Sequence, residues 1–420
     1  MKSFEKVIGY DDVKEELLKV ADMFNNPEEY KEIGAHIPKG ILIHGRPGMG
    51  KTLIANEFAD ICACNKRIIR KNRNSLDFIN EMRNVFEEAS KDAPSIIILD
   101  DMDKFLSDDD SREEYYSVQA CIDEVSDKDV LVVATANYIS DMPGSLLRNG
   151  RFDLEFELEV LPKGVSERIV DMSLNGGKLL DPSIPSEDVK KLFLSLDPAT
   201  IQTILNQCKI SMKYYKTDRI LRTMLIDAFL KNERVAYDSY NTDYVKENVA
   251  YHEAGHLVIR EIINPQSVSL VAVKTTENGI SGIVYGSPVY DRYSGSRKRI
   301  CESLAGMACE EQKFGYITEG SMDDIRDVNC NLEYDVRLGK CGLELASAGL
   351  CFDDSKELVS REQQHVEAEK KRLYALTKKT LIDNWEFVEE VAKKLMECDA
   401  LMYSDIQNIR NKHSYSELVV

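Results

Sequence analysis

The feature that most constrains the fold is a glycine-rich octapeptide that lies between an apolar run and a helical pattern. It fits the spacing G-x-x-x-x-G-K-[ST] and consists of Gly45, Arg46, Pro47, Gly48, Met49, Gly50, Lys51 and Thr52. The apolar run at 40–43 predicts a strand, and residues 53–61 predict a helix. A strand, such a loop and a helix in this order are typical of α/β domains that bind nucleotides, because the backbone N–H groups can close around phosphates. A glycine-rich turn without a ligand is the alternative.

Two further apolar runs extend this pattern. Residues 96–99 end in Asp100 and Asp101, and residues 130–135 end close to Asn137. An uninterrupted apolar run suits a strand that is buried on both faces. Strands that alternate with helices predict a doubly wound, mostly parallel sheet.

The polar residues of this half suit phosphate chemistry. Lys51 would reach the β- and γ-phosphates, while the Thr52 hydroxyl and the carboxylate after the second run would bind Mg²⁺. The amide of Asn137 could orient an attacking water. Arg148 and Arg151 could stabilise charge on the γ-phosphate, in cis or across a subunit boundary; surface arginines in salt bridges are the alternative reading.

Residues 252–256 read His-Glu-Ala-Gly-His. Positions i and i+4 lie on one face of a helix, so His252 and His256 could bind one zinc ion. Zinc lowers the pKa of a bound water to about 7, and Glu253 could take its proton. An apolar helix face is predicted from Val249, Ala250, Ala254, Leu257, Val258 and Ile262. Two surface histidines on an ordinary helix are the alternative.

Length and composition restrict the class of protein. A chain of 420 residues predicts two to three domains. The net charge of −19, from 54 basic and 73 acidic residues, argues against a nucleic-acid partner. Ten cysteines without a CxxC pair favour reduced thiols and a cytoplasmic location. Neither a signal peptide nor an apolar stretch of about 18–20 residues is found, so no membrane span is expected.

The order and spacing of these motifs resemble an AAA+ ATPase, and the whole chain resembles the FtsH family of ATP-dependent zinc proteases. The likeness covers most of residues 4–330. It is carried by the segments 4–9, 37–40, 45–52, 83–89, 96–103, 146–153, 251–256 and 304–311.

The resemblance implies a multidomain chain. Residues 1–158 would form an AAA+ nucleotide-binding α/β domain with a doubly wound parallel sheet, 159–236 a helical lid, and 237–420 a mostly α-helical zinc metallopeptidase domain. ATP, Mg²⁺ and Zn²⁺ are the implied cofactors, and polypeptides are the implied substrates. Lys51, Thr52 and Asp100 would serve ATP and magnesium, and Asn137 would be the polar sensor. Arg148 and Arg151 would act on a neighbour's nucleotide, which implies a ring, in the family a homohexamer.

A third zinc ligand is needed, since catalytic zinc usually has three protein ligands. The extended pattern with a further glycine and histidine is absent, because Ile259 and Ile262 occupy those places. The segment 320–325 resembles the family's segment that ends in Asn-Asp-Ile, which implies Asp324 as the ligand. Asp323, which fills the family's asparagine place, is the rival.

The chain departs from the family pattern at four places. Asp101 stands where the family has the glutamate that polarises the attacking water. The aromatic position of the pore loop falls at Asn74, and Phe78 is either its substitute or a core residue. Residues 196–200 replace the lid's usual Gly-Phe-Ser-Gly-Ala-Asp stretch. The family's transmembrane N-terminus is missing, so a soluble or a trimmed member is expected.

Three functions compete. The first is an ATP-dependent zinc endopeptidase, favoured by the intact zinc motif. The second is a nucleotide-switched assembly or chaperone-like ring with weak or ATP-independent peptidase activity, favoured by Asn74 and Asp101. The third, a plain ATPase with structural zinc, is weaker because structural sites are usually closed by four protein ligands. In the second half, residues 266–290 predict a hairpin, and the chain from 297 to the end predicts helices.

Overall fold

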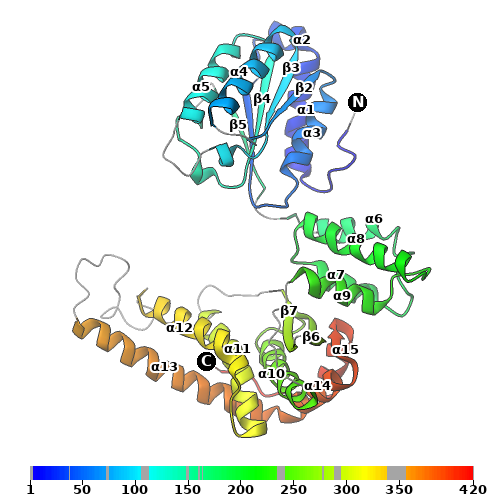
Figure 1. The fold of residues 1–420 in the computed structure, drawn as a ribbon, viewed down its shortest axis with the longest axis vertical. Helices are drawn as coiled ribbons and strands as arrows, with labels where there is room; N and C mark the ends of the chain where they lie inside the picture. The colour runs from blue at the N-terminus through cyan, green and yellow to red at the C-terminus, as the bar shows by residue number, and fades with distance from the viewer. Residues whose placement is uncertain are drawn as a thin grey trace. The chain divides into compact units, whose positions relative to one another are not determined.

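The computed structural model describes residues 3–36, 38–71, 75–105, 113–147, 151–158, 161–162, 164–233, 242–276, 279–287, 295–337 and 356–419. Its elements are shown in Figure 1. By its internal contacts the chain divides into two compact units. The first comprises Met1–Ser173 and Leu196–Thr203, and the second comprises Leu174–Ser195 and Ile204–Val420. The predicted lid, 159–236, therefore contributes helices to both units, and its limits stay a prediction.

The first unit contains the predicted parallel sheet. Its strands are β1 (Gly40–His44), β2 (Asn65–Ile69), β3 (Ser95–Leu99), β4 (Val130–Ala136) and β5 (Leu154–Glu157). They lie in the order β2-β3-β4-β1-β5, and every neighbouring pair is parallel. Every residue of β1, β3 and β4 is buried, which explains why these three strands read as uninterrupted apolar runs.

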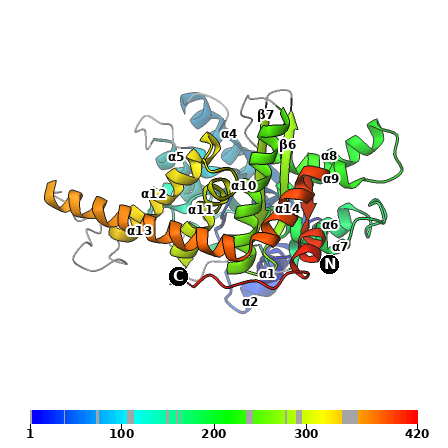
Figure 2. The ribbon, with the colours of Figure 1, turned by 90° about the horizontal axis from the view of Figure 1, so that it is seen from below.

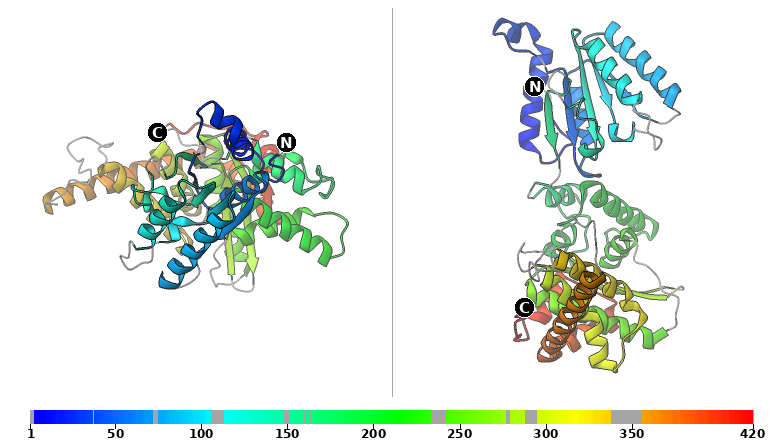
Figure 3. Two further views of the ribbon diagram at one scale, coloured as in Figure 1. Left: turned by 90° about the horizontal axis from the view of Figure 1, so that it is seen from above. Right: turned by 90° about the vertical axis from the view of Figure 1, so that its left-hand side faces the viewer.

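Helices cover both faces of this sheet. They are α1 (Asp11–Asn25), α3 (Lys51–Ile61), α4 (Ser75–Lys91) and α5 (Glu113–Val125). The short helix α2 (Pro27–Glu32) contacts α1, and 3₁₀ helices lie at Met102–Phe105 and Ile139–Asp141. Alternate strand residues serve the two faces: Ile41 and Ile43 belong to the cluster under α1 and α3, and Leu42 to the one under α4 and α5. The right-hand view in Figure 3 shows the two helical layers on either side of the strands.

The described helices in the range predicted for the lid are α6 (Val165–Ser173), α7 (Ser186–Phe193), α8 (Pro198–Tyr214) and α9 (Arg222–Asn232). Within the second unit, α7 is joined to the C-terminal helix α15 (Tyr403–Arg410). Buried Asp188 accepts hydrogen bonds from the backbone N–H of Ser404 at 2.7 Å and from its hydroxyl at 2.8 Å. This carboxylate therefore satisfies an unpaired donor at the start of α15.

The second unit is mostly helical. Its further elements are α10 (Thr242–Ile263), β6 (Val268–Thr276), β7 (Gly279–Gly286), α11 (Gly295–Phe314), a 3₁₀ turn (Glu319–Ser321), α12 (Met322–Arg337), α13 (Lys356–Asp383), α14 (Trp385–Cys398) and β8 (Ala400–Met402). The predicted hairpin is confirmed as antiparallel β6 and β7, which lie alongside α10 in Figure 2. The expectation of helices alone after residue 297 is wrong at β8, which pairs with β6. Three residues are too few to show an alternating pattern.

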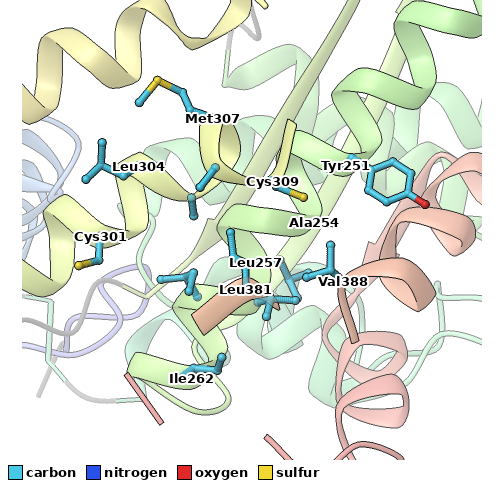
Figure 4. Packing of buried hydrophobic residues seen from close by; sticks show 14 of the residues in the cluster. Tyr251, Ala254, Leu257, Ile262, Cys301, Leu304, Met307, Cys309, Leu381 and Val388 are labelled. Carbon is cyan, nitrogen blue, oxygen red and sulfur yellow. The ribbon is translucent and has the colours of Figure 1, made fainter. Parts of the chain in front are cut away.

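An apolar cluster holds the helices after residue 242 together. Figure 4 shows side chains of α10, α11, α13 and α14 converging, with Leu257, Leu304, Leu381 and Val388 among them. These four side chains are at most 1% exposed. The cluster fixes α10 against α11, the two helices on which the histidine motif and its surroundings lie. Among the described helices, none has the length and apolarity to cross a bilayer.

Candidate metal centre and nucleotide site

Three potential metal ligands converge in the second unit. Helix α10 presents His252 and His256 one turn apart, with their Nε2 atoms 2.9 Å from each other. Asp324, in the first turn of α12, brings Oδ2 to 3.2 Å from Nε2 of His252 and 3.3 Å from Nε2 of His256. These three are the group that could hold a metal ion within the described part of the chain.

The other nitrogen of each imidazole is also engaged. Nδ1 of His252 lies 2.9 Å from Oε1 of Glu310, and Nδ1 of His256 lies 2.7 Å from the carbonyl oxygen of Glu302. Metal-binding histidines almost always donate their second N–H in this way, which fixes the tautomer and leaves Nε2 free to bind. Two imidazoles and one carboxylate also match the donor set of a catalytic zinc site with an open position. The residues therefore fit zinc.

Glu310 is itself fixed in place. Its Oε2 accepts a hydrogen bond from the backbone N–H of Thr318 at 2.6 Å, and its Oε1 accepts one from the Thr318 hydroxyl at 2.8 Å. Glu310 is 1% exposed and Thr318 belongs to the segment that leads into α12. This chain of contacts links the orientation of His252 on α10 to the position of Asp324 on α12.

The surroundings of this centre favour the charged forms of His252 and Asp324. Burial alone would lower the pKa of His252, but hydrogen bonds to Asp324 and Glu310 and the charge of Glu253 outweigh it and raise the pKa to about 10. Burial opposes charge on Asp324 too, yet both imidazoles together hold its pKa below the ordinary value. Burial raises the pKa of Glu253 although the neighbouring histidines favour its charged form. Glu253 is therefore a stronger base than an exposed glutamate.

Glu253 and the three potential ligands line one cavity of about 670 Å³. Two glycines give these side chains their room. A Cβ on Gly282 of β7 would lie 2.3 Å from Cγ of Glu253, and a Cβ on Gly306 of α11 would lie 2.4 Å from Cε1 of His252. Any other residue at position 282 would require the Glu253 side chain to move, and any other residue at 306 would require the His252 ring to move.

Asp323 and Asp324 have different surroundings. The side chain of Asp323 is 90% exposed and forms an ion pair with Arg326 at 2.8 Å. The side chain of Asp324 is 25% exposed and faces both histidines. The geometry thus favours Asp324 over its rival as the third ligand.

In the first unit, residues of the glycine-rich loop at 45–52, called the phosphate loop from here on, form one hydrogen-bonded cluster with residues at the ends of strands. Nζ of Lys51 donates to the carbonyls of Gly45 at 2.7 Å and Arg46 at 2.9 Å, and to Oδ1 of Asn137 at 2.9 Å. Burial lowers the pKa of Lys51 despite nearby acids. The Thr52 hydroxyl donates to Oδ1 of Asp100 at 2.6 Å. Residues predicted for nucleotide binding at 51, 52, 100 and 137 are thus neighbours.

Asp100 and Asp101 differ in their contacts. Asp100 is 4% exposed and also accepts hydrogen bonds from Thr135 at 2.8 Å and from Nε of Arg70 at 2.7 Å. Asp101 has φ of 55°, and its carboxylate pairs with Lys104 at 2.7 Å. The carboxylate of Asp101 thus points to Lys104.

The remaining predicted residues fall into two groups. Arg151 contacts Asp123 through two hydrogen bonds, at 2.9 and 3.1 Å, and donates to the carbonyl of Ser145 at 2.6 Å. Arg148 and Asn74 lie outside the described residues. Phe78, left open as a pore residue, is a core residue: it is 1% exposed and its ring contacts that of Phe105.

Sequence reasoning missed several residues of both sites. Glu310 and Gly306 lie in the segment 304–311, which carries part of the family likeness, but this segment alone does not link either residue to His252. Thr318 and Gly282 carry no local signal, because only the tertiary packing brings them to the histidine motif. Arg70 also carries no local signal, because its contact with Asp100 joins residues 30 positions apart.

Comparisons with known proteins agree with this geometry. Residues 41–160 match the ATPase family associated with various cellular activities (AAA), and residues 240–409 match peptidase family M41. The ATP-dependent zinc metalloprotease FtsH 2 of Thermoanaerobacter sp. is 27% identical over 97% of this chain and 82% of its own length. FtsH of Opitutus terrae is 27% identical over 99% and 72%, and FtsH 3 of Symbiobacterium thermophilum is 29% identical over 77% and 55%. The chain, an AAA domain followed by an M41 domain with relatives along its length, belongs to the FtsH-like family of ATP-dependent zinc metalloproteases.

Proposed function

We propose that this protein is an ATP-dependent zinc endopeptidase in which a homohexameric ring uses ATP hydrolysis to deliver polypeptides to Glu253. The observation that carries the proposal is the convergence of His252, His256 and Asp324 beside buried Glu253 in one cavity. The AAA domain on the same chain supports the coupling to ATP.

His252, His256 and Asp324 would hold the zinc ion. Zinc there would act as a Lewis acid that polarises the scissile carbonyl and lowers the pKa of a water. Glu253 takes the proton from the attacking water and passes it to the leaving amine. Its raised pKa suits this role, because a general base works best when its pKa approaches the operating pH. Glu310 and the carbonyl of Glu302 keep both imidazoles oriented.

In the AAA domain, the backbone N–H groups of the loop at 45–52 would bind the phosphates of ATP. Lys51 would neutralise phosphate charge, and Thr52 and Asp100 would bind Mg²⁺. Asp101 and Asn137 would orient the attacking water. Arg148 and Arg151 would act on the nucleotide of the neighbouring subunit.

A second candidate, a nucleotide-switched assembly ring with weak or ATP-independent peptidase activity, is favoured by one observation. The carboxylate of Asp101 pairs with Lys104 at 2.7 Å, and it is one methylene shorter than the family's glutamate. A misplacement near 1 Å can cost about 10²-fold in rate. ATP hydrolysis would then be slow. Bound nucleotide would control the assembly of the ring more than it would drive polypeptides toward the peptidase site.

Substitution of the general base tests the peptidase. Glu253→Gln is isosteric and leaves the three ligands intact, so we expect it to retain zinc and to lose hydrolysis of an unfolded protein such as casein. Zinc content is measured by atomic absorption on the same samples. Glu319→Gln, which removes an exposed acid from the turn before α12, is the control and should keep both properties. Retained hydrolysis in Glu253→Gln would refute the mechanism.

A further inference from the structure

A carboxylate from the segment before α8 lies directly against the phosphate loop. Gly48 has φ of +83°, and a Cβ built on it would lie 2.2 Å from Oδ1 and 2.7 Å from Cγ of Asp197. The carboxylate thus occupies the place where any other residue at position 48 would have its side chain. Both residues belong to the first compact unit.

Two hydrogen bonds hold this carboxylate in position. The backbone N–H of Thr200 donates to Oδ1 at 3.0 Å, and the Thr200 hydroxyl donates to Oδ2 at 2.7 Å. Asp197 therefore caps the first turn of α8, in the manner of aspartate at a helix start. The cap fixes the carboxylate against Gly48 and leaves it no freedom to swing away without cost to the helix.

The charge of Asp197 is not paired with a described basic residue. In the described parts of the chain, no lysine or arginine forms an ion pair with it, whereas Asp100 is paired with Arg70 and Asp101 with Lys104. The loop has two cations: Arg46, which is exposed, and Lys51, which already feels the charges of three acids, at 100, 101 and 103. A phosphate bound to the loop would therefore meet, across the backbone of Gly48, a carboxylate that is not held in an ion pair with either of them.

We propose that Asp197 is a specificity-determining residue of the nucleotide site, which disfavours nucleotides in proportion to their negative charge and so selects the magnesium complex of ATP over metal-free ATP. The inference rests on the nucleotide binding proposed above. Its physical basis is Coulomb repulsion between the Asp197 carboxylate and phosphates bound to the loop, which salt screens only in part at separations below the Debye length of about 8 Å. Mg²⁺ neutralises two of the negative charges on the ATP phosphates, which reduces their repulsion by Asp197.

The test is ATP binding to the full chain by isothermal titration calorimetry, with excess Mg²⁺ and with EDTA. Asp197→Asn keeps the cap, because asparagine caps helices as well as aspartate does. We expect the Kd for metal-free ATP to fall about tenfold and the Kd for MgATP by about threefold or less, so that the preference for MgATP shrinks. High salt should reduce the difference in Kd between the wild type and the variant, because it screens the charge of Asp197.

Two further variants serve as controls. Asp197→Ser, another capping residue without charge, should reproduce the change. Asp181→Asn removes the same charge from an aspartate in a turn, where Asp181 accepts hydrogen bonds from the N–H and hydroxyl of Ser183, and should leave both Kd values unchanged.

The outcomes separate this inference from the proposed function. Wild-type protein that fails to bind MgATP would overturn the proposed nucleotide role, and with it the role of Asp197. Wild-type protein that binds MgATP, with the preference unaltered in Asp197→Asn and Asp197→Ser, would overturn the role of Asp197 alone. Equal weakening of both forms of ATP in the two variants would also overturn it, because it would mark the carboxylate as a structural support of the loop.

Discussion

At the scale of single residues, the metal centre depends on which atom of each side chain is left free. Nδ1 of His252 and of His256 is occupied by Glu310 and by the carbonyl of Glu302, so only Nε2 of each ring faces Asp324. The orientation of the potential ligands is therefore fixed by partners outside the proposed ligand set.

The choice between two adjacent acids gives a direct test. Asp324→Asn should lose most of its zinc, because the amide no longer supplies an anionic ligand beside the two imidazoles. Asp323→Asn should keep full zinc occupancy, since the Asp323 side chain is 90% exposed and pairs with Arg326. Zinc content after dialysis against a weak chelator measures both. Full zinc in Asp324→Asn with loss in Asp323→Asn would reverse the assignment.

Zinc uptake should depend on pH. In the metal-free protein the pKa of His252 is about 10, against 6.5 for an ordinary histidine. The stability from its charged pairs with Asp324 and Glu310 is therefore fully present below pH 6.5 and is lost as the pH rises toward 10. Zinc needs the neutral ring, so binding must release protons and the apparent affinity must rise with pH across this window. Calorimetric zinc titrations in buffers of different ionisation enthalpy measure the protons released. Affinity without pH dependence would contradict the charged pairs.

The sequence made part of this site predictable. His252, Glu253 and His256 could be predicted from spacing because a helix places i and i+4 on one face, which is a local property. Asp324 is 68 positions beyond His256, and no local rule joins them; only the family likeness pointed to it. Glu310, Gly306 and Gly282 reach the histidine motif through tertiary packing, which no sequence period encodes.

At the scale of elements, the site depends on how closely β7 approaches α10. Gly282 leaves just enough space for Glu253, since a Cβ there would lie 2.3 Å from its Cγ and its Oε1. The strand thus forms the wall against which the Glu253 carboxylate, the proposed general base, is positioned.

Gly282→Ala should therefore impair catalysis without unfolding the protein. The added methyl group would push the Glu253 carboxylate aside, and a shift near 1 Å can cost about 10²-fold in kcat. Zinc content should stay unchanged, because the three atoms nearest to a Cβ at position 282 all belong to Glu253 and not to a potential ligand. The pH profile of kcat should also shift, as the burial that raises the pKa of Glu253 is altered. Unchanged kcat and pH profile would show that β7 does not position Glu253.

Elements were predictable where burial imposed a pattern. The strands at 40–44, 95–99 and 130–136 are buried on both faces and showed it as apolar runs. The hairpin of β6 and β7 was also predicted. Strand β8 was missed because three residues at 400–402 cannot display alternation, and its pairing with β6 depends on a contact across more than a hundred residues.

At the scale of the whole molecule, an AAA domain and an M41 domain share one chain, with matches at 41–160 and 240–409. Their order was predictable from two short motifs. The division of the lid helices was not, because it depends on contacts such as that of Asp188 with Ser404, which attaches α7 to the second unit.

Coupling between the two activities is best tested by degradation of an unfolded protein. Purified full chain with zinc is compared in ATP, in a non-hydrolysable ATP analogue and without nucleotide, with Glu253→Gln as the blank. We expect cleavage only with hydrolysable ATP, which would establish an energy-coupled protease despite Asp101 and Asn74. Cleavage at the same rate with the analogue, or without nucleotide, would contradict this coupling and leave the AAA domain as a switch for assembly.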